Sequence, residues 1–244
     1  MEPIKKILVS QSGNLFYVRN TTQDFHNQYG FVTKADLNSD KTEVESNTGH
    51  KFTMFEPGFG DNFRKMKRGP QMIPLKDIGL IISETGINKE SVIVDAGAGS
   101  GGLSSFLASI AKKVTTYEIR EDFLKIAEGN KELLGLKNLT IKNKDIYQGI
   151  DEKNVDVVCL DLPEPWKAVP HAKQALKTGG FLVSYSPTIP QVMDLVESIQ
   201  KEGFLIWKTT EVIERVWEVE KRKVRPKSIP IGHSGFLTFA RKIN

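Results

Sequence analysis

The chain has 244 residues, of which 39% are hydrophobic and 26% are charged. This composition excludes a chain that is disordered throughout and a collagen-like repeat, and it predicts a globular protein with one sizeable core and a smaller module. Lys and Arg number 34 against 30 Asp and Glu. The resulting net charge of +4 permits a polyanionic partner without requiring one.

The charge is distributed unevenly along the chain. Residues 1–77 and 201–244 carry an excess of Lys and Arg, whereas residues 78–200 carry an excess of Asp and Glu. An acidic centre between basic ends is typical of a small-molecule site flanked by segments that hold nucleic acid. Solvated surface charge that happens to be uneven explains the pattern equally well, so charge alone does not decide between the two.

The order of turn formers and apolar runs divides the chain into three parts. Residues 1–62 combine short apolar runs with turn formers, which predicts a small β domain. Residues 63–90 form a basic linker and a leading helix from Leu75 to about Glu84, and residues 91–244 form the main domain. The short runs predicted as strands of the β domain are Ile7–Val9, Leu15–Val18 and Lys51–Phe55.

From Ser91 onward, strand-like and helix-like stretches alternate. Strands alternating with helices need crossover connections, so the pattern predicts an α/β fold with a doubly wound, mostly parallel sheet. The predicted strands are 92–94, 114–117, 139–141, 155–160 and 181–185, and the predicted helices are 103–111, 121–134, 168–176 and 191–201.

After Gly203 the helical pattern stops. Phe204–Trp207 and Glu211–Val219 are predicted as strands, and the basic stretch Lys221–Lys227 leads to a final strand-like run, Gly235–Lys242. Two long consecutive strands fit a closing antiparallel hairpin at the sheet edge.

The single cysteine, Cys159, lies in an apolar run and is predicted to be a small buried hydrophobic residue. No window of about 18 apolar residues occurs, and the N-terminus lacks the apolar stretch of a signal peptide. We therefore expect a soluble, cytoplasmic protein with no membrane partner, and we expect no metal.

A glycine-rich turn follows the first predicted strand of the main domain. Gly97, Gly99 and Gly102 satisfy a loose G-x-G-x-x-G pattern, and Ser100 and Gly101 complete the turn. Glycine suits such a turn because the backbone needs positive φ and must approach a ligand closely. The pattern alone is weak, and a dinucleotide is one interpretation of it.

Two carboxylates near the turn bear on the cofactor: Asp95 favours S-adenosylmethionine over a dinucleotide, whereas Glu118 indicates a ribose and is shared with dinucleotide folds. Asp95 precedes the glycine turn, where it would repel a pyrophosphate but attract the ammonium group of S-adenosylmethionine. Glu118 ends the next strand, where a carboxylate can accept hydrogen bonds from both ribose hydroxyls. The alternative is a buried acidic residue at the end of a strand beside a structural turn.

Two further motifs follow the third and fourth strands. Asp145 is predicted to accept a hydrogen bond from the exocyclic amine of adenine, with Ile146 against the ring, although a helix N-cap is an equally good interpretation of Asp145. Asp161, with the prolines around Pro163 and with Trp166, suits a site that recognises a flat base. The alternative is a strand end with a proline turn and a tryptophan in the core.

Together these stretches resemble the tRNA (adenine-N1)-methyltransferases that act in the T loop, in their archaeal and bacterial single-subunit form. The resemblance extends over nearly the whole chain and is most specific around Asp161 and His233. The matching stretches are Arg68–Asp77, Asp95–Leu103, Tyr117–Phe123, Lys144–Tyr147, Leu160–Trp166 and Gly232–Lys242.

The resemblance implies a class I S-adenosylmethionine-dependent methyltransferase (Rossmann-like) fold behind a small N-terminal β domain, working as a homotetramer. It places Asp161 between the cofactor and the target base. Relatives often have an aromatic residue or His followed by Pro where this chain has Pro74-Leu75, and usually Thr where it has Ser234. The cofactor residues that the resemblance implies are Gln71 to Ile73, Ser100 to Gly102, Glu118, Asp145 and Ile146.

The chemistry of the implied reaction follows from the base itself. N1 of adenine has a free lone pair, so attack on a sulfonium methyl group needs alignment rather than prior deprotonation. Positive charge then develops on the purine, and the Asp161 carboxylate is expected to stabilise that charge as the catalytic group. N1 lies on the Watson–Crick edge, so the base must be flipped out. Pro163, Trp166, Arg225 and His233 are the expected tRNA contacts.

The expected target is adenine 58, and the sequence leaves open whether adenine 57 is modified as well. Three other functions fit parts of the sequence: a class I methyltransferase for a protein or small molecule, a non-catalytic RNA-binding subunit, and an NAD-dependent dehydrogenase. The first has no need of basic ends, and the second has no need of a complete cofactor site. The third would bind NAD instead of S-adenosylmethionine.

Overall fold

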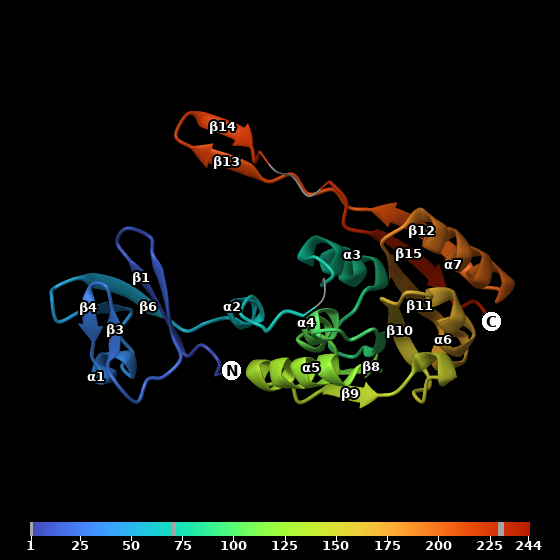
Figure 1. Cartoon of the computed structure of the whole chain (residues 1–244), viewed down its shortest axis with the longest axis horizontal. Coiled ribbons are helices and arrows are strands. Elements are labelled where there is room, and N and C mark those ends of the chain that lie inside the picture. The colour runs from blue at the N-terminus through green and yellow to red at the C-terminus, as the bar shows by residue number, and fades with distance from the viewer. Residues whose placement is uncertain (1, 70–71, 229–231) are drawn as a thin grey trace. The chain divides into compact units, whose positions relative to one another are not determined.

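The computed structural model describes residues 2–69, 72–228 and 232–244. They divide into two compact units (Figure 1). One runs to Met66 and includes Glu132–Gly135, and the other comprises Lys67–Lys131 and Leu136–Asn244. Within the described ranges, no helix is long and apolar enough to cross a membrane.

The first unit is built on a four-stranded antiparallel sheet with the order β2-β1-β6-β5. Alternating side chains such as Phe52 and Met54 are buried, and they form a small core with Leu8, Val18 and Leu37. The three runs predicted as strands all lie in this sheet. Its elements are β1 (Lys6–Ser10), β2 (Leu15–Val18), β3 (Phe25–Asn27), β4 (Gly30–Val32), α1 (Lys34–Leu37), β5 (Glu43–Glu45), β6 (Lys51–Phe55) and α2 (Phe59–Phe63).

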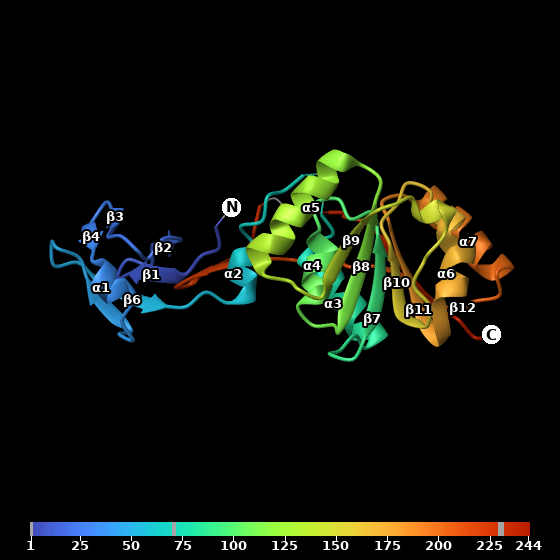
Figure 2. The ribbon, with the colours of Figure 1, turned by 90° about the horizontal axis from the view of Figure 1, so that it is seen from below.

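The second unit is a seven-stranded sheet with the order β12-β15-β11-β10-β7-β8-β9. The five strands from β11 to β9 run parallel, which confirms the predicted doubly wound α/β fold. Helices α3 to α5 lie on one face and α6 and α7 on the other (Figure 2). The elements are α3 (Leu75–Thr85), β7 (Val92–Ala96), α4 (Gly102–Ala108), β8 (Lys113–Glu118), α5 (Glu121–Leu134), β9 (Leu139–Asn143), η1 (Ile146–Gln148), β10 (Val155–Leu160), η2 (Pro165–Ala168), α6 (Val169–Ala175), β11 (Leu176–Ser186), α7 (Ile189–Lys201), β12 (Leu205–Glu211), β13 (Trp217–Glu220), β14 (Lys223–Pro226) and β15 (Phe236–Arg241).

The central strands β7 and β10 are almost completely buried because helices cover both faces of the sheet. Cys159 on β10 is 1% exposed, as predicted for a small hydrophobic residue. Because the carboxyl ends of parallel strands meet at one edge, the segments that follow β7, β8, β9 and β10 converge there. This edge carries most of the predicted site residues.

The prediction of one strand from Glu211 to Val219 is wrong. Strand β12 ends at Glu211 because its partner β15 begins at Phe236, and Glu211 and Phe236 are the last pair of that ladder. Residues 212–216 form no strand, and β13 pairs with β14 in a separate hairpin (Figure 1). Lys221 in the hairpin turn has φ of 53°. The predicted antiparallel addition at the sheet edge consists of β15 and β12.

Candidate active site

The glycine turn after β7 adopts a backbone conformation that side chains would strain. Gly97, Gly99 and Gly101 have φ values of 82°, 54° and 79°, in the left-handed region. A Cβ atom on Gly97 would lie 2.0 Å from the carbonyl oxygen of Asp161. The backbone N–H of Asp161 donates to the carbonyl of Ala96 at 2.9 Å. The turn and the Asp161 segment are therefore in direct backbone contact.

A buried asparagine on α5 supports the turn from behind. The side-chain amide of Asn130 donates to the carbonyls of Ser100 at 2.8 Å and Lys67 at 2.9 Å, and its oxygen accepts from the Lys67 N–H at 2.9 Å. Asn130 was not among the residues predicted from the sequence. The sequence does contain a sign of this role, because Asn130 is a polar residue in the apolar stripe of α5 that includes Ile126 and Leu133. A buried amide at such a position needs hydrogen-bond partners.

The segment between the linker and α3 packs against the same turn. A Cβ atom on Gly102, the first residue of α4, would lie 3.0 Å from Cε of Met72. The neighbouring Ile73 is 5% exposed. The predicted cofactor residue Gln71 lies outside the described residues.

Glu118 at the end of β8 is bound tightly by backbone groups. Its Oε2 accepts from the N–H of Gly99 at 2.8 Å, and its Oε1 accepts from the N–H groups of Ile119 and Arg120 at 3.0 Å each. These bonds fix the carboxylate beside the glycine turn. Oε2 has a second lone pair, so the group can still accept a hydrogen bond from a ribose.

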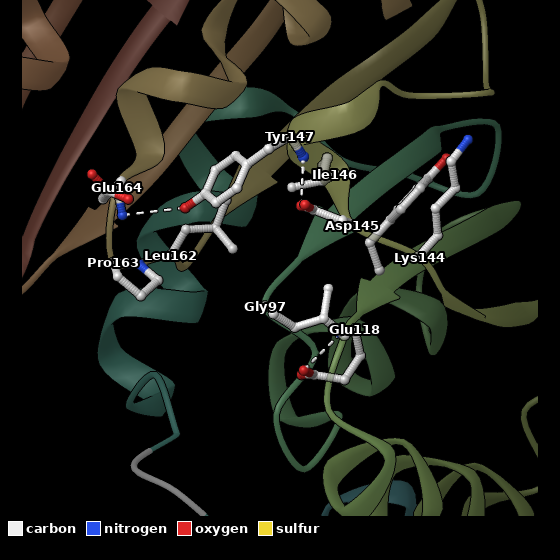
Figure 3. A pocket seen from close by; sticks show the side chains of 11 residues that line it. Gly97, Glu118, Lys144, Asp145, Ile146, Tyr147, Leu162, Pro163 and Glu164 are labelled. Atoms are coloured by element: carbon white, nitrogen blue, oxygen red, sulfur yellow. Dashed lines mark hydrogen bonds between the residues drawn. The ribbon is translucent and has the colours of Figure 1, made fainter.

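A cavity of about 150 Å³ opens beside Glu118 (Figure 3). Its lining is largely apolar, which suits the faces of a flat ring, and carboxylates stand at its edge. Tyr147 and Leu162 were not predicted, although Tyr147 follows directly on a predicted adenine contact. The lining residues include the predicted site residues Gly97, Glu118, Asp145, Ile146 and Pro163, together with Tyr147, Leu162 and Glu164.

Both interpretations of Asp145 fit the structure. Its Oδ1 accepts from the N–H of Tyr147 at 2.9 Å, so it is the N-cap of the short helix η1. The same side chain lines the cavity, as Figure 3 shows. The cap fixes the direction of the carboxylate, and Ile146 behind it is 3% exposed.

Two carboxyl groups beside the glycine turn carry unusual pKa values. Burial raises the pKa of Asp95 to about 6, and the negative charge of Glu118 adds to the rise. Burial also raises the pKa of Asp161 to about 7, and the charge of Asp95 adds to it. Both groups therefore lie where a negative charge is unfavourable unless a cation is present.

The partners of Asp95 fit the cationic cofactor predicted from the sequence. Its Oδ2 accepts from the Thr116 hydroxyl at 2.6 Å. Its Oδ1 is buried and has no hydrogen-bond partner among the residues that the structure describes. A buried carboxylate oxygen without a partner beside a glycine turn fits an ammonium group.

Three predicted tRNA contacts lie outside the lining of this cavity. Trp166 is in η2, where its carbonyl accepts from the Ser198 hydroxyl at 3.1 Å. Arg225 is on β14 and pairs with Glu218 at 2.8 Å. His233 lies just before β15. In the described parts of the chain, no cluster of three or more His, Cys, Asp or Glu side chains is arranged to hold a metal.

The comparison of this chain with known protein families agrees with the geometry. Residues 65–229 match the family described as tRNA methyltransferase complex GCD14 subunit. The chain belongs to this family. It is 36% identical to the tRNA (adenine(57)-N(1)/adenine(58)-N(1))-methyltransferase TrmI of Methanocaldococcus jannaschii, over 97% of this chain and 94% of that protein. It is 32% identical to the tRNA (adenine(58)-N(1))-methyltransferase TrmI of Thermus thermophilus, over 82% and 80% of the two chains.

Solved structures of the same architecture include a SAM-dependent O-methyltransferase from Thermotoga maritima. It superposes with a TM-score of 0.83 and 29% identity, covering 100% of this chain and 95% of that one. The tRNA (m1A58) methyltransferase TrmI from Aquifex aeolicus superposes with a TM-score of 0.79 and 24% identity, covering 100% and 99%. The fold of this family member is therefore that of the class I S-adenosylmethionine-dependent methyltransferases.

Proposed function

We propose that this protein transfers the methyl group of S-adenosylmethionine to N1 of adenine 58 in the T loop of tRNA. The observation that carries the proposal is the position of Asp161, a carboxylate at the tip of β10 in backbone contact with the glycine turn. The names of the Methanocaldococcus and Thermus relatives, both adenine-58 methyltransferases, support the choice of substrate. The first of these names also includes adenine 57.

The cofactor is assigned to the edge of the sheet formed by the glycine turn and the cavity. Asp95, whose buried Oδ1 has no partner among the described residues, would bind its ammonium group, and Glu118 would accept from its ribose. Asp145 and Ile146 would bind the adenine in the cavity. When bound, S-adenosylmethionine supplies an electrophilic methyl group on a positively charged sulfur. Further cofactor contacts are assigned to Gln71, Ile73, Gly97, Gly99, Ser100, Gly101, Gly102 and Asp161.

Asp161 has three tasks in the proposed reaction. Its carboxylate accepts a hydrogen bond from the N6 amino group of the target adenine, which orients N1. As positive charge develops on the purine, the same carboxylate stabilises that charge in a site with little water. It is ionised for this role above its pKa of about 7 in the free protein. It can then take a proton from N6.

The basic ends of the chain supply the proposed tRNA surface. Arg64–Arg68 and Lys221–Lys227 concentrate positive charge outside the acidic centre, as phosphate binding requires. Pro163, at the rim of the cavity, and Trp166 are assigned to the extruded base, and Arg225 to a phosphate. We retain residues 1–62 as a β domain, 63–90 as linker and leading helix, and 91–244 as methyltransferase domain.

The proposed assembly is a homotetramer working in the cytoplasm, where its tRNA substrate is found. The hairpin β13–β14 and the segment before it support self-association, because they expose large apolar side chains that a monomer would leave in water. Light scattering should give four times the 27.3 kDa mass of one chain. The exposed residues are Ile213, Val216, Trp217, Val219 and Val224, which are between 45% and 71% accessible.

Transfer of labelled methyl groups to unmodified tRNA tests the proposal. We expect label in wild-type transcript, and none in a transcript whose adenines 57 and 58 are both replaced. Single replacements then separate the two adenines. Equal labelling of the doubly replaced transcript, or labelling of protein only, would contradict the proposal and favour another class I methyltransferase. No labelling at all would favour a non-catalytic RNA-binding subunit.

A further inference from the structure

A buried network joins the first turn of α3 to the segment before β15, 157 residues later in the chain. Asp77 is completely buried, and both of its carboxylate oxygens accept from Nζ of Lys76 at 2.9 Å. The hydroxyl of Ser234 completes the triangle: it accepts from Lys76 at 2.6 Å and donates to Asp77 Oδ2 at 3.0 Å. Of these three residues, Ser234 is the one that belongs to the C-terminal segment.

The backbone on either side of Ser234 is fixed as well. Its carbonyl accepts from the hydroxyl of Tyr185, which is 7% exposed. A Cβ atom on Gly235 would lie 2.3 Å from Cζ of the Tyr185 ring, so the backbone lies flat against that ring. The segment is therefore held at its side chain and at its backbone, although it has no regular secondary structure.

The neighbouring His233 is held at both ring nitrogens. Nδ1 lies 2.5 Å from Oε1 of Glu211, and Nε2 lies 2.9 Å from the carbonyl oxygen of Pro187. Both partners are hydrogen-bond acceptors, which favours a proton on each ring nitrogen. Consistently, the bonds to Glu211 and to Pro187 raise the pKa of His233, and the charge of nearby Lys76 opposes the rise.

This arrangement leaves His233 one way to contact a ligand. With both N–H groups engaged, the ring has no free donor or acceptor for the edge of a base. Its side chain is nevertheless 44% exposed, and one neighbour of the ring is Phe236, at 4.8 Å between centroids. The exposed part is therefore ring face and carbon, which suits stacking on an unpaired base.

The network is also close to the proposed catalytic residue. Burial raises the pKa of the Tyr185 hydroxyl, and the negative charges of Asp77 and Asp161 both add to the rise. Leu160 pairs with Ser184 in the sheet, so Asp161 and Tyr185 directly follow that pair on two adjacent parallel strands. His233 bonds to the carbonyl of Pro187, two residues after Tyr185, so it lies at the same end of β11 as Asp161.

We infer that Lys76, Asp77 and Ser234 are positioning residues, and that they hold the ring of His233 as a rigid stacking surface for an unpaired base of the tRNA. The inference rests on the proposed function, because it names a part of the same site. A stacking surface is useful only when it is ordered before the base arrives, since ordering it on binding reduces affinity. Ser234 matters here because its hydroxyl connects the segment to a buried ion pair.

Steady-state kinetics with Ser234→Ala and Ser234→Thr test the positioning role. We expect Ser234→Ala to raise the KM for tRNA about tenfold while the KM for S-adenosylmethionine stays within about twofold. Ser234→Thr keeps the hydroxyl and should restore the wild-type KM. Ser83→Ala is the matched control, because the Ser83 hydroxyl on α3 bonds only to the carbonyl of Leu80 in its own helix. Thermal unfolding of each variant separates a positioning defect from unfolding.

Two variants of His233 show whether Ser234 acts through that ring. In a His233→Ala background, adding Ser234→Ala should change the KM for tRNA little further, because the ring that Ser234 positions is already missing. His233→Phe keeps a flat ring without N–H groups and should bind tRNA better than His233→Ala. Additive effects of the two alanine substitutions, or equal losses in the Phe and Ala variants, would overturn the inference.

A measurement without tRNA separates this inference from the proposed function. Nitrogen-15 NMR of the four histidines across a pH series should show that His233 keeps both ring protons to higher pH in wild type than in Ser234→Ala. If the wild type transfers no methyl group to tRNA, the proposed function fails, and the stacking role fails with it. If the wild type is active but Ser234→Ala matches it in kinetics and NMR, only the positioning inference fails.

Discussion

Replacing Asp161 by Asn should stabilise the ligand-free protein at high pH and leave its stability unchanged at low pH. The wild-type carboxyl has a pKa of 3.8 when exposed in the unfolded chain and about 7 in the folded protein. Between these values the folded state binds more protons than the unfolded state, so the free energy of unfolding falls as pH rises from about 4 to about 7. The amide of Asn has the same shape and does not titrate in this range.

The size of the effect follows from the same two pKa values. Between pH 5 and pH 8, ionisation of this group lowers the free energy of unfolding of the wild type. About two pH units of this interval lie between the two pKa values, so the loss is at most about 3 kcal/mol. For a chain of this size, 1 kcal/mol changes the melting temperature by about 2 to 4 °C. We therefore expect the melting temperature of Asp161→Asn, relative to wild type, to rise by several degrees between pH 5 and pH 8.

Calorimetry without cofactor at a series of pH values is the assay, and Asp194→Asn is the control. Asp194 is exposed on α7, so its replacement should give the same small change at every pH. The reasoning is refuted if Asp161→Asn is no more stable than wild type at pH 8, or if it is equally stabilised at pH 5. Either result would mean that the Asp161 carboxylate is not disfavoured in the folded protein.

Three further predictions concern the same edge of the sheet. Gly97→Ala places a Cβ atom 2.0 Å from the Asp161 carbonyl oxygen, so calorimetric titration should show at least about tenfold weaker binding of S-adenosylmethionine. Asn130→Ala leaves the Ser100 and Lys67 backbone groups without their partner, and urea unfolding should show a loss of about 2 to 4 kcal/mol; a loss below about 0.5 kcal/mol would contradict this. Because Asp161 must be ionised, kcat/KM for tRNA should rise with pH through about 7, and a flat profile from pH 5 to 9 would exclude that role.

The fold could be predicted from the sequence because its determinants are local. Alternating strand and helix patterns after Ser91 required crossovers, and crossovers required a parallel sheet. That sheet brings the ends of β7, β8, β9 and β10 to one edge, so the strand pattern alone was enough to group residues such as Glu118 and Asp145. The cavity brings both of them together with Gly97, Ile146 and Pro163.

The features that could not be predicted from the sequence depend on contacts between distant parts of the chain. The end of β12 at Glu211 is set by where β15 begins, 25 residues later in the sequence, and no local pattern encodes that. Asn130 looks like an ordinary helix residue until its partners at Ser100 and Lys67 are known. The partners of His233 at Glu211 and Pro187 likewise raise its pKa and engage both ring nitrogens, and neither contact can be read from the sequence around His233.

The central claim is methylation of N1 in one tRNA adenine with the help of Asp161. The most direct test is mass spectrometry of nucleosides and of nuclease fragments from unmodified tRNA after incubation with S-adenosylmethionine and either the wild type or Asp161→Asn. The account predicts 1-methyladenosine at position 58 with the wild type, and a yield lower by at least about a hundredfold with the variant at equal cofactor occupancy. A methylated cytidine, a methyl group on another atom of adenine, or equal yields from both proteins would contradict it.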